Sequence, residues 1–152
     1  MMKKVLVTGG QGYIGSVLIP FLLSKEIDII CYDLGLFKNC KITKDEISNN
    51  NAFDRFKTLY KDSRDINMHE LENIDTVVHL SGISNDPLNS LPSRSVYDPT
   101  REYTLKLAAK CKSLGIKFIF AFSCSVYGAF YVNNILTEEA ENNPSTGYSH
   151  NN

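Results

Sequence analysis

Short apolar runs rich in β-branched residues recur along the chain, and segments with helical spacing lie between them. Runs of this length and composition predict strands. The first, fourth and fifth runs are almost continuously apolar, which is typical of strands covered on both faces in a parallel sheet. The five predicted strands are Lys4–Thr8, Ile27–Tyr32, Phe56–Tyr60, Thr76–Leu80 and Lys117–Phe122.

Two stretches carry apolar residues at the spacing of a helix face. The first runs from Ile14 to Phe21, and the second from Leu105 to Leu114, where Gly115 predicts a C-terminal stop. Pro20 is expected to remove one backbone hydrogen bond and to bend the first helix. The polar stretch 34–55 predicts a variable loop with room for one short helix. The order β-α-β-loop-β-β-α-β predicts an open α/β fold.

Length and composition describe one soluble globular domain, residues 1–152, with 43% apolar and 22% charged residues. A net charge of −1 argues against a nucleic-acid or membrane-surface partner, because no basic excess is present to neutralise phosphates. There is no signal-peptide core and no 18-residue apolar span. The four cysteines form no CxxC pair, which favours reduced thiols and a cytoplasmic location.

A glycine-rich loop, TGGQGYIG, lies between the first strand and the first helix, with Gly9, Gly12 and Gly15 spaced three apart. A pyrophosphate needs backbone N–H groups and a helix N-terminus at close range, where side chains would block its approach. Gly9 suits the tight turn, Gly12 the contact with the diphosphate, and Gly15 the packing of helix on strand. The predicted cofactor-binding residues of this loop are Gly9, Gln11, Gly12, Tyr13, Ile14 and Gly15.

Asp33 ends the second predicted strand. A carboxylate at this position accepts hydrogen bonds from a ribose 2′-OH and repels a 2′-phosphate, so it favours NAD over NADP. The alternative is a glycine turn followed by an ordinary strand-end aspartate.

These residues, together with Asp62–Asp65 (DSRD), His79–Gly82 (HLSG) and Phe122–Gly128 (FSCSVYG), resemble the extended short-chain dehydrogenase/reductases. The closest group is the NAD-dependent epimerases and dehydratases of nucleotide sugars, and the likeness runs from residue 2 to about residue 148. It implies a doubly wound, mostly parallel, Rossmann-like NAD-binding domain. By resemblance, Asp62 contacts the adenine amino group, Ser63 adds a backbone contact, and the cofactor is lined by Leu80, Ser81 and Gly82. Asp62 can alternatively be a solvated loop carboxylate, and His79 is interpreted as a packed strand residue.

The resemblance also assigns catalytic roles. Ser123 stands where the family keeps its catalytic hydroxyl, Tyr148 where it keeps the acid/base tyrosine, and Ser125 is a candidate substrate contact. A strand-capping serine and an ordinary tail tyrosine are the alternatives. Asn152 replaces the lysine that follows the family tyrosine by four residues, and an uncharged amide cannot favour a phenolate as an ammonium does. Thr100 stands where the family usually has asparagine.

Family members continue well beyond this length, so the resemblance predicts an N-terminal cofactor-binding part without the C-terminal substrate domain. A nucleotide-diphosphate sugar is the expected partner of a completed protein, and a homodimer is possible by analogy with related proteins. Two alternatives stay open: a non-catalytic NAD-binding module and an inactive truncated fragment. We expect no turnover of nucleotide sugars by this chain alone.

Overall fold

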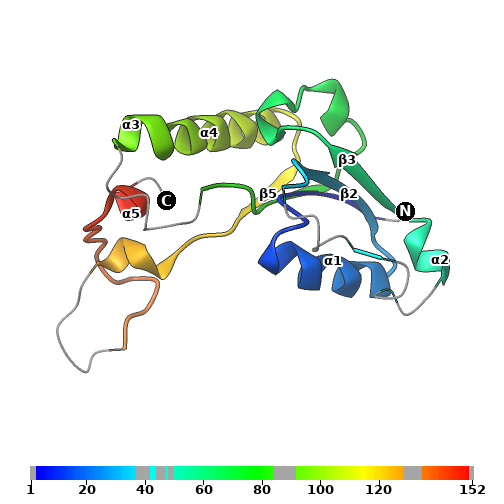
Figure 1. Ribbon diagram of the computed structural model, residues 1–152, viewed down its shortest axis with the longest axis horizontal. Coiled ribbons are helices and arrows are strands. Elements are labelled where there is room, and N and C mark those ends of the chain that lie inside the picture. Colours follow the sequence, from blue (N-terminus) through cyan, green and yellow to red (C-terminus); the bar gives the residue numbers. More distant parts are fainter. Residues whose placement is uncertain are drawn as a thin grey trace. The chain divides into compact units, whose positions relative to one another are not determined.

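The computed structural model describes residues 3–36, 42–43, 47, 50–83, 92–128 and 135–150. It contains a parallel sheet with the strand order β3-β2-β1-β4-β5, of which β2, β3 and β5 are labelled in Figure 1. The five predicted strands are confirmed, with small differences at their ends: the second runs one residue later, to Asp33, the fourth stops one residue early, and the fifth stops two residues early. The strands are β1 (Lys4–Thr8), β2 (Asp28–Asp33), β3 (Phe56–Tyr60), β4 (Thr76–His79) and β5 (Lys117–Phe120).

The two long helices lie where the apolar spacing predicts them, although the second begins at Asp98, seven residues before the predicted start. Pro20 lies inside the first of them, and the helix nevertheless continues to Ser24. The helices are α1 (Tyr13–Ser24), α2 (Asn50–Phe53), α3 (Ser93–Val96), α4 (Asp98–Ser113) and α5 (Gly147–His150), with 3-10 turns η3 (Ser63–Asp65), η4 (His69–Leu71) and η6 (Cys124–Tyr127). None of the described helices combines the length and apolar character that a membrane span requires.

The described residues fall into two compact units. The sheet unit comprises residues 1–82 and 105–121, and therefore contains the sheet, α1 and the second half of α4. The tyrosine unit comprises residues 83–104 and 122–152, and contains η6 and α5.

Both faces of the sheet are covered, as the continuous apolar strands predict. Alternate residues of a strand point to opposite faces, so Val5 and Val7 of β1 pack with Ile19 and Leu23 of α1, whereas Leu6 packs on the other side. The second cluster is completed by Tyr32, Ile66, Leu71, Ile74, Val77, Leu107, Cys111 and Ile116. Full burial of a leucine or isoleucine contributes about 1.5–3 kcal/mol. The two clusters therefore hold the sheet edge, where the strand-end loops lie, in a fixed geometry.

Parts of the predicted variable loop contribute to the core. Ile42, Ile47 and Ala52 are buried in the cluster on the α1 side, and α2 is the short helix expected in this stretch. The polar composition of residues 34–55 therefore concealed three apolar positions that pack against the sheet.

Candidate cofactor-binding and catalytic sites

The predicted cofactor-binding residues follow the carboxyl ends of four neighbouring strands. The glycine turn follows β1, Asp33 ends β2, Asp62 and Ser63 follow β3, and Leu80 to Gly82 follow β4. In a parallel sheet these ends share one edge, which is where open α/β folds bind their ligands. The sheet unit therefore brings together every predicted cofactor-binding residue.

The three glycines of the turn have different surroundings. Gly9 has φ +68°, and a Cβ there would lie 2.8 Å from the backbone nitrogen of Ser81. A Cβ on Gly15 would overlap the backbone of Gly10, so α1 can pack on the turn only with glycine at this position. A Cβ on Gly12 would meet one atom, the carbonyl oxygen of Gly9 at 3.2 Å. Gly9 and Gly15 are therefore required by the fold, whereas Gly12 leaves room for a ligand.

The N-terminus of α1 has the features of an anion site. Gly12 is its N-cap and supplies no side-chain cap, and the first turn holds no acidic residue. Tyr13 and Ile14 are exposed at this helix start. Backbone N–H groups at such a terminus and the helix dipole both favour a phosphate. The residues present thus fit the diphosphate of a dinucleotide.

Asp33 is held by two backbone donors. Its Oδ2 accepts a hydrogen bond from Gln11 N at 3.0 Å, and its Oδ1 accepts one from Gly35 N at 2.7 Å. Each carboxylate oxygen has a second lone pair. The carboxylate is therefore oriented by the protein and retains acceptor capacity for ribose hydroxyls, which fits the predicted role.

Gln11 links three strand ends. Besides the contact of its backbone with Asp33, its side-chain Nε2 donates to the hydroxyl of Tyr60 at 3.2 Å, and the residue is 2% exposed. A Cβ on Gly35 would lie 2.8 Å from the Tyr60 ring. Sequence reasoning missed Tyr60, because nothing in FKTLY distinguishes its last residue from any strand-end aromatic residue.

Asp62 binds the side chain of Arg64, two residues further along the chain. It caps η3 by accepting from Arg64 N at 2.9 Å, and its two oxygens contact the guanidinium at 2.5–3.0 Å. The hydrogen bonds from the Arg64 side chain hold the pKa of Asp62 below its ordinary value, against a smaller opposing effect of burial. A carboxylate offers about four acceptor sites, so the predicted contact with adenine requires Asp62 to serve a ligand and Arg64 together.

The loops after β3 and β4 are joined by the hydroxyls of Ser63 and Ser81, which lie 2.9 Å apart. Thr8, at the end of β1, accepts from the backbone nitrogens of Leu80 and Ser81 through its Oγ1, each at 3.3 Å. The same Oγ1 lies 2.6 Å from Nδ1 of His79. Sequence reasoning missed Thr8, because its contacts depend on which strand becomes the neighbour of β1.

His79 is a packed strand residue, as predicted. It has no exposed surface, and its ring lies 5.8 Å from that of Phe118 and 5.7 Å from that of Phe120. Burial lowers the pKa of His79 from its ordinary value near 6.5 to about 4. The imidazole is therefore neutral at neutral pH.

The predicted catalytic serines lie in the tyrosine unit. Ser123 caps η6, and its Oγ accepts from Ser125 N at 3.2 Å. Ser123 is thus the N-cap of a 3-10 turn and not a strand cap, and this contact leaves its hydroxyl proton for another acceptor. Ser125 Oγ is buried without a hydrogen-bond partner among the described residues.

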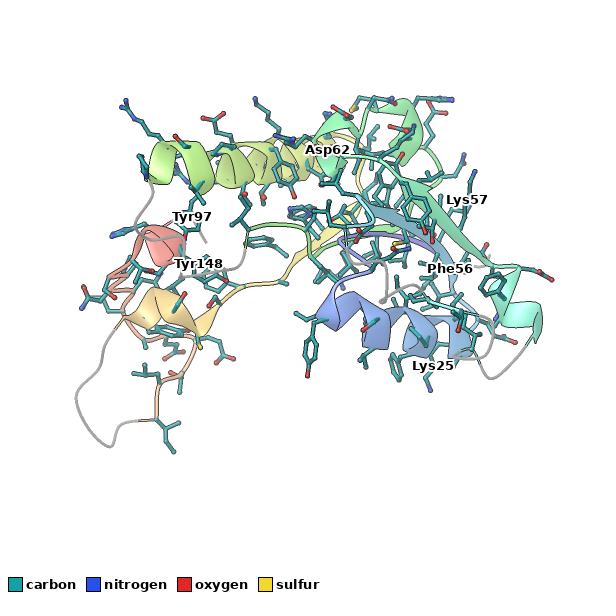
Figure 2. All side chains as sticks on the ribbon, viewed as in Figure 1. Lys25, Phe56, Lys57, Asp62, Tyr97 and Tyr148 are labelled. Carbon is teal, nitrogen blue, oxygen red and sulfur yellow. The ribbon has the colours of Figure 1, made fainter. Side chains whose placement is uncertain are left out.

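Tyr148 lies in a capped turn of helix. Ser149 N donates to Thr146 Oγ1 at 3.1 Å, and Thr146 N donates to Ser149 Oγ at 2.9 Å, so the two residues cap the start of α5 reciprocally. The ring of Tyr148 packs edge-on against that of Tyr97, with centroids 6.1 Å apart (Figure 2). Tyr97 is 2% exposed and was not predicted. Asn152 lies outside the described residues.

Thr100 lies within α4, where its carbonyl oxygen accepts from Thr104 Oγ1 at 2.8 Å. Among the described residues no three His, Cys, Asp or Glu side chains gather as a metal site would require. The described cysteines are free thiols, with Cys31 and Cys111 buried and Cys124 exposed; Cys40 lies outside the described residues.

The strand order, the glycine turn and the helix that follows it define a Rossmann-like nucleotide-binding fold. Residues 5–151 match the NAD dependent epimerase/dehydratase family, and the chain belongs to this family.

Similar proteins include UDP-glucose 4-epimerases and a solved UDP-N-acetylglucosamine 4-epimerase. The UDP-glucose 4-epimerase of Neisseria meningitidis serogroup C is 31% identical, over 84% of this chain and 38% of that protein. The one from Klebsiella pneumoniae is 29% identical, over 82% of this chain and 92% of that protein. The structure of UDP-N-acetylglucosamine 4-epimerase from Methanobrevibacter ruminantium M1 matches with a TM-score of 0.79 and 28% identity, over 99% of this chain and 47% of that one. The chain thus spans less than half of two of these three proteins.

Proposed function

We propose that this chain binds NAD as the N-terminal cofactor-binding part of a nucleotide-sugar epimerase or dehydratase. The observation that carries the proposal is the pair of backbone hydrogen bonds that orient Asp33 at the end of β2, next in the fold to the uncapped start of α1. An oriented carboxylate and an open helix N-terminus are the two features that a ribose and a diphosphate require. Family membership supports the same cofactor.

Each part of the proposed site has its own task. Gly12 and the first turn of α1 would hold the diphosphate, and Asp33 would accept from the ribose hydroxyls. Asp62 and Ser63 would contact the adenine, and Leu80, Ser81 and Gly82 would line the cofactor. When bound, NAD supplies a hydride acceptor.

The tyrosine unit would supply the proton chemistry. The phenol of Tyr148 would exchange a proton with a sugar hydroxyl, and the hydroxyl of Ser123 would orient that oxygen. Ser125, whose buried hydroxyl lacks a partner among the described residues, would contact the substrate. The expected substrate of the completed protein is a nucleotide-diphosphate sugar, and its expected location is the cytoplasm.

A second candidate function is binding of NAD without catalysis. The observation in its favour is Asn152, which stands at the position where the family resemblance places a lysine. Without a neighbouring ammonium, Tyr148 loses one source of stabilisation of its phenolate.

Calorimetric titration of the folded 152-residue chain with NAD and with NADP tests the proposal. We expect saturable NAD binding and an affinity for NADP at least about tenfold lower, since Asp33 repels a 2′-phosphate. A folded sample that binds neither dinucleotide would refute the proposal, and equal affinities would refute the role of Asp33. Incubation with UDP-glucose and NAD separates the two functions: epimerisation by this chain alone would contradict our expectation of no turnover.

A further inference from the structure

The hydroxyl of Thr8 is the meeting point of β1, β4 and the loop after β4. Its Oγ1 accepts from Ser81 N and Leu80 N at 3.3 Å each and lies 2.6 Å from His79 Nδ1. Leu80 N also donates to the carbonyl oxygen of Thr8 at 3.1 Å, so this donor is shared. All these atoms belong to the sheet unit.

The proton of the Thr8 hydroxyl can be placed by counting donors and acceptors. A hydroxyl has two lone pairs and one proton. Because both lone pairs face backbone N–H groups, the proton points to Nδ1 of His79, which must act as the acceptor. The ring is then the neutral tautomer with its proton on Nε2, in agreement with the low pKa of about 4 that burial gives His79.

This arrangement controls the distance between the glycine turn and the loop after β4. Gly9 follows Thr8 directly, and a Cβ on Gly9 would lie 2.8 Å from Ser81 N and 2.9 Å from Ser81 Cα. The two backbones therefore touch, with no space for adjustment. Ser81 in turn reaches the loop after β3 through Ser63. The Thr8 hydroxyl is thus part of a hydrogen-bonded chain that links the glycine turn with the loops after β4 and β3.

We propose that His79 is a positioning residue of the dinucleotide site: its Nδ1 fixes the Thr8 hydroxyl, which holds Leu80 and Ser81 against the glycine turn. The inference rests on the proposed NAD binding for its functional consequence, but the hydrogen-bonded chain itself requires no ligand. His79 touches no cofactor in this role and acts only through Thr8.

Three variants of the 152-residue chain separate positioning from packing. His79→Phe keeps an aromatic ring between Phe118 and Phe120 but has no acceptor, Thr8→Val removes the hydroxyl at constant volume, and His79→Asn keeps an acceptor near the position of Nδ1. We expect His79→Phe and Thr8→Val each to weaken NAD binding roughly five- to tenfold, the loss of one buried hydrogen bond. His79→Asn should stay within about twofold of the wild type, and the double variant Thr8→Val/His79→Phe should bind no more weakly than either single variant.

Two measurements without cofactor make the outcome independent of the proposed function. Amide exchange of Leu80 and Ser81 should accelerate in His79→Phe and Thr8→Val and stay unchanged in His79→Asn. In the wild type, nitrogen chemical shifts should show His79 Nδ1 unprotonated and Nε2 protonated. A protonated Nδ1, or unchanged exchange of Leu80 and Ser81 in Thr8→Val, would overturn the inference. Failure of the wild type to bind NAD while these results hold would refute only the proposed function. If His79→Phe fails to fold, the amide exchange of Thr8→Val and the tautomer of His79 in the wild type still test the inference.

Discussion

The cofactor-binding loops and the segment around Tyr148 are held by different kinds of contact. In the sheet unit, the hydrogen bonds that fix the candidate site join residues far apart in sequence: Gln11 with Asp33, Thr8 with His79, and Ser63 with Ser81. In the tyrosine unit, Ser123 and Ser149 bond within two or three residues of themselves. Strand-end loops of one sheet meet because the sheet aligns them, whereas a short capped turn needs only its own side chains.

The two regions therefore depend on different parts of the structure for their stability. The dinucleotide site requires the whole sheet, so a change in the core or in the turn should affect folding and binding together. The turn that carries Tyr148 is fixed locally by its capping pair, and its contact with Tyr97 adds one aromatic pair that contributes about 0.5–1.5 kcal/mol. Local perturbation there should leave the sheet unit intact.

The largest effect is expected from Gly15→Ala. The added Cβ would overlap the backbone of Gly10 and force α1 away from the turn. We expect a loss of at least about 3 kcal/mol in the free energy of unfolding, measured by urea denaturation, and no detectable NAD binding.

Two glycine variants serve as controls for Gly15→Ala. Gly115 has φ +69° and no atom within 4 Å of a Cβ, so Gly115→Ala should cost only about 1–2 kcal/mol, the strain of a left-handed residue, without loss of NAD affinity. Gly12 has φ −81°, so Gly12→Ala should keep nearly full stability yet impair binding. Equal stability of Gly15→Ala and Gly12→Ala would contradict the assigned roles.

Acid should weaken the sheet unit through His79. Its pKa is lowered in the folded state to about 4, while the unfolded chain binds the proton near 6.5. The stability contribution is therefore complete above about pH 6.5 and is lost as the pH falls towards 4, by roughly 2 kcal/mol between pH 7 and pH 5. Urea denaturation at these two pH values measures the drop.

His79→Asn is the matched control. Because asparagine does not titrate, the free energy of unfolding of this variant should fall less between pH 7 and pH 5 than that of the wild type. Glu70 adds a separate effect at lower pH. Hydrogen bonds from Tyr32 and Lys61 lower its pKa to about 2, so its contribution is lost below about pH 4.5. A wild-type drop between pH 7 and pH 5 that persists undiminished in His79→Asn would assign the acid sensitivity to other groups.

A smaller effect, confined to ligand choice, is expected at Asp33. Asp33→Ser removes the negative charge and should lower NAD affinity about tenfold while improving NADP binding. The ratio of NAD affinity to NADP affinity should therefore fall towards one or below it. Asp33→Asn removes the charge but keeps one acceptor oxygen, which can bind either Gln11 N or Gly35 N. This variant should therefore separate the effect of the lost charge from that of a changed loop structure. Calorimetry with both dinucleotides measures the change; an unchanged preference in both variants would exclude Asp33 as its source.

The smallest effect is expected in the tyrosine unit. Thr146→Ala removes the acceptor for Ser149 N and should destabilise the start of α5 by about 1 kcal/mol. Amide exchange at Tyr148 and Ser149 should accelerate, while exchange in the strands and NAD affinity stay unchanged. Ser113→Ala, which loses an exposed hydroxyl contact at the end of α4, is the control. Weaker NAD binding by Thr146→Ala would contradict the statement that a local change near Tyr148 leaves the dinucleotide site unaffected.

The sequence predicted the parts of the fold that periodicity and glycine encode. Continuous apolar strands, the two helices and the glycine turn are local signals, and each matches the structure within one or two residues or, for the helix ends, within seven: α4 begins at Asp98, well before the predicted start at Leu105. The burial of Ile42 and Ile47 was not predicted, because a core position inside a polar stretch is determined by what packs on it. Long-range pairing is similarly invisible in the local pattern.

The candidate site shows the same limit. Asp33 and the glycines could be proposed because their chemistry is recognisable at a known distance from a strand. The contacts of Tyr60 with Gln11, and of Thr8 with His79, could not, because they depend on which strands become neighbours. Asp62 illustrates a second difficulty: its carboxylate binds Arg64 two residues away, and the predicted contact with adenine must be shared with that arginine.

Gly10 lies directly over Cys31, since a Cβ on this glycine would be 2.6 Å from the Cys31 sulfur. Burial, with a smaller effect of the Asp33 charge, raises the pKa of the Cys31 thiol to about 12, so the thiolate is scarce while the turn is closed. Cys31 has no exposed surface, so a thiol reagent can reach it only when the packing around it opens, and the glycine turn is part of that packing. The rate at which the reagent labels Cys31 would therefore report how often the turn opens. A ligand bound at the glycine turn should lower this labelling rate.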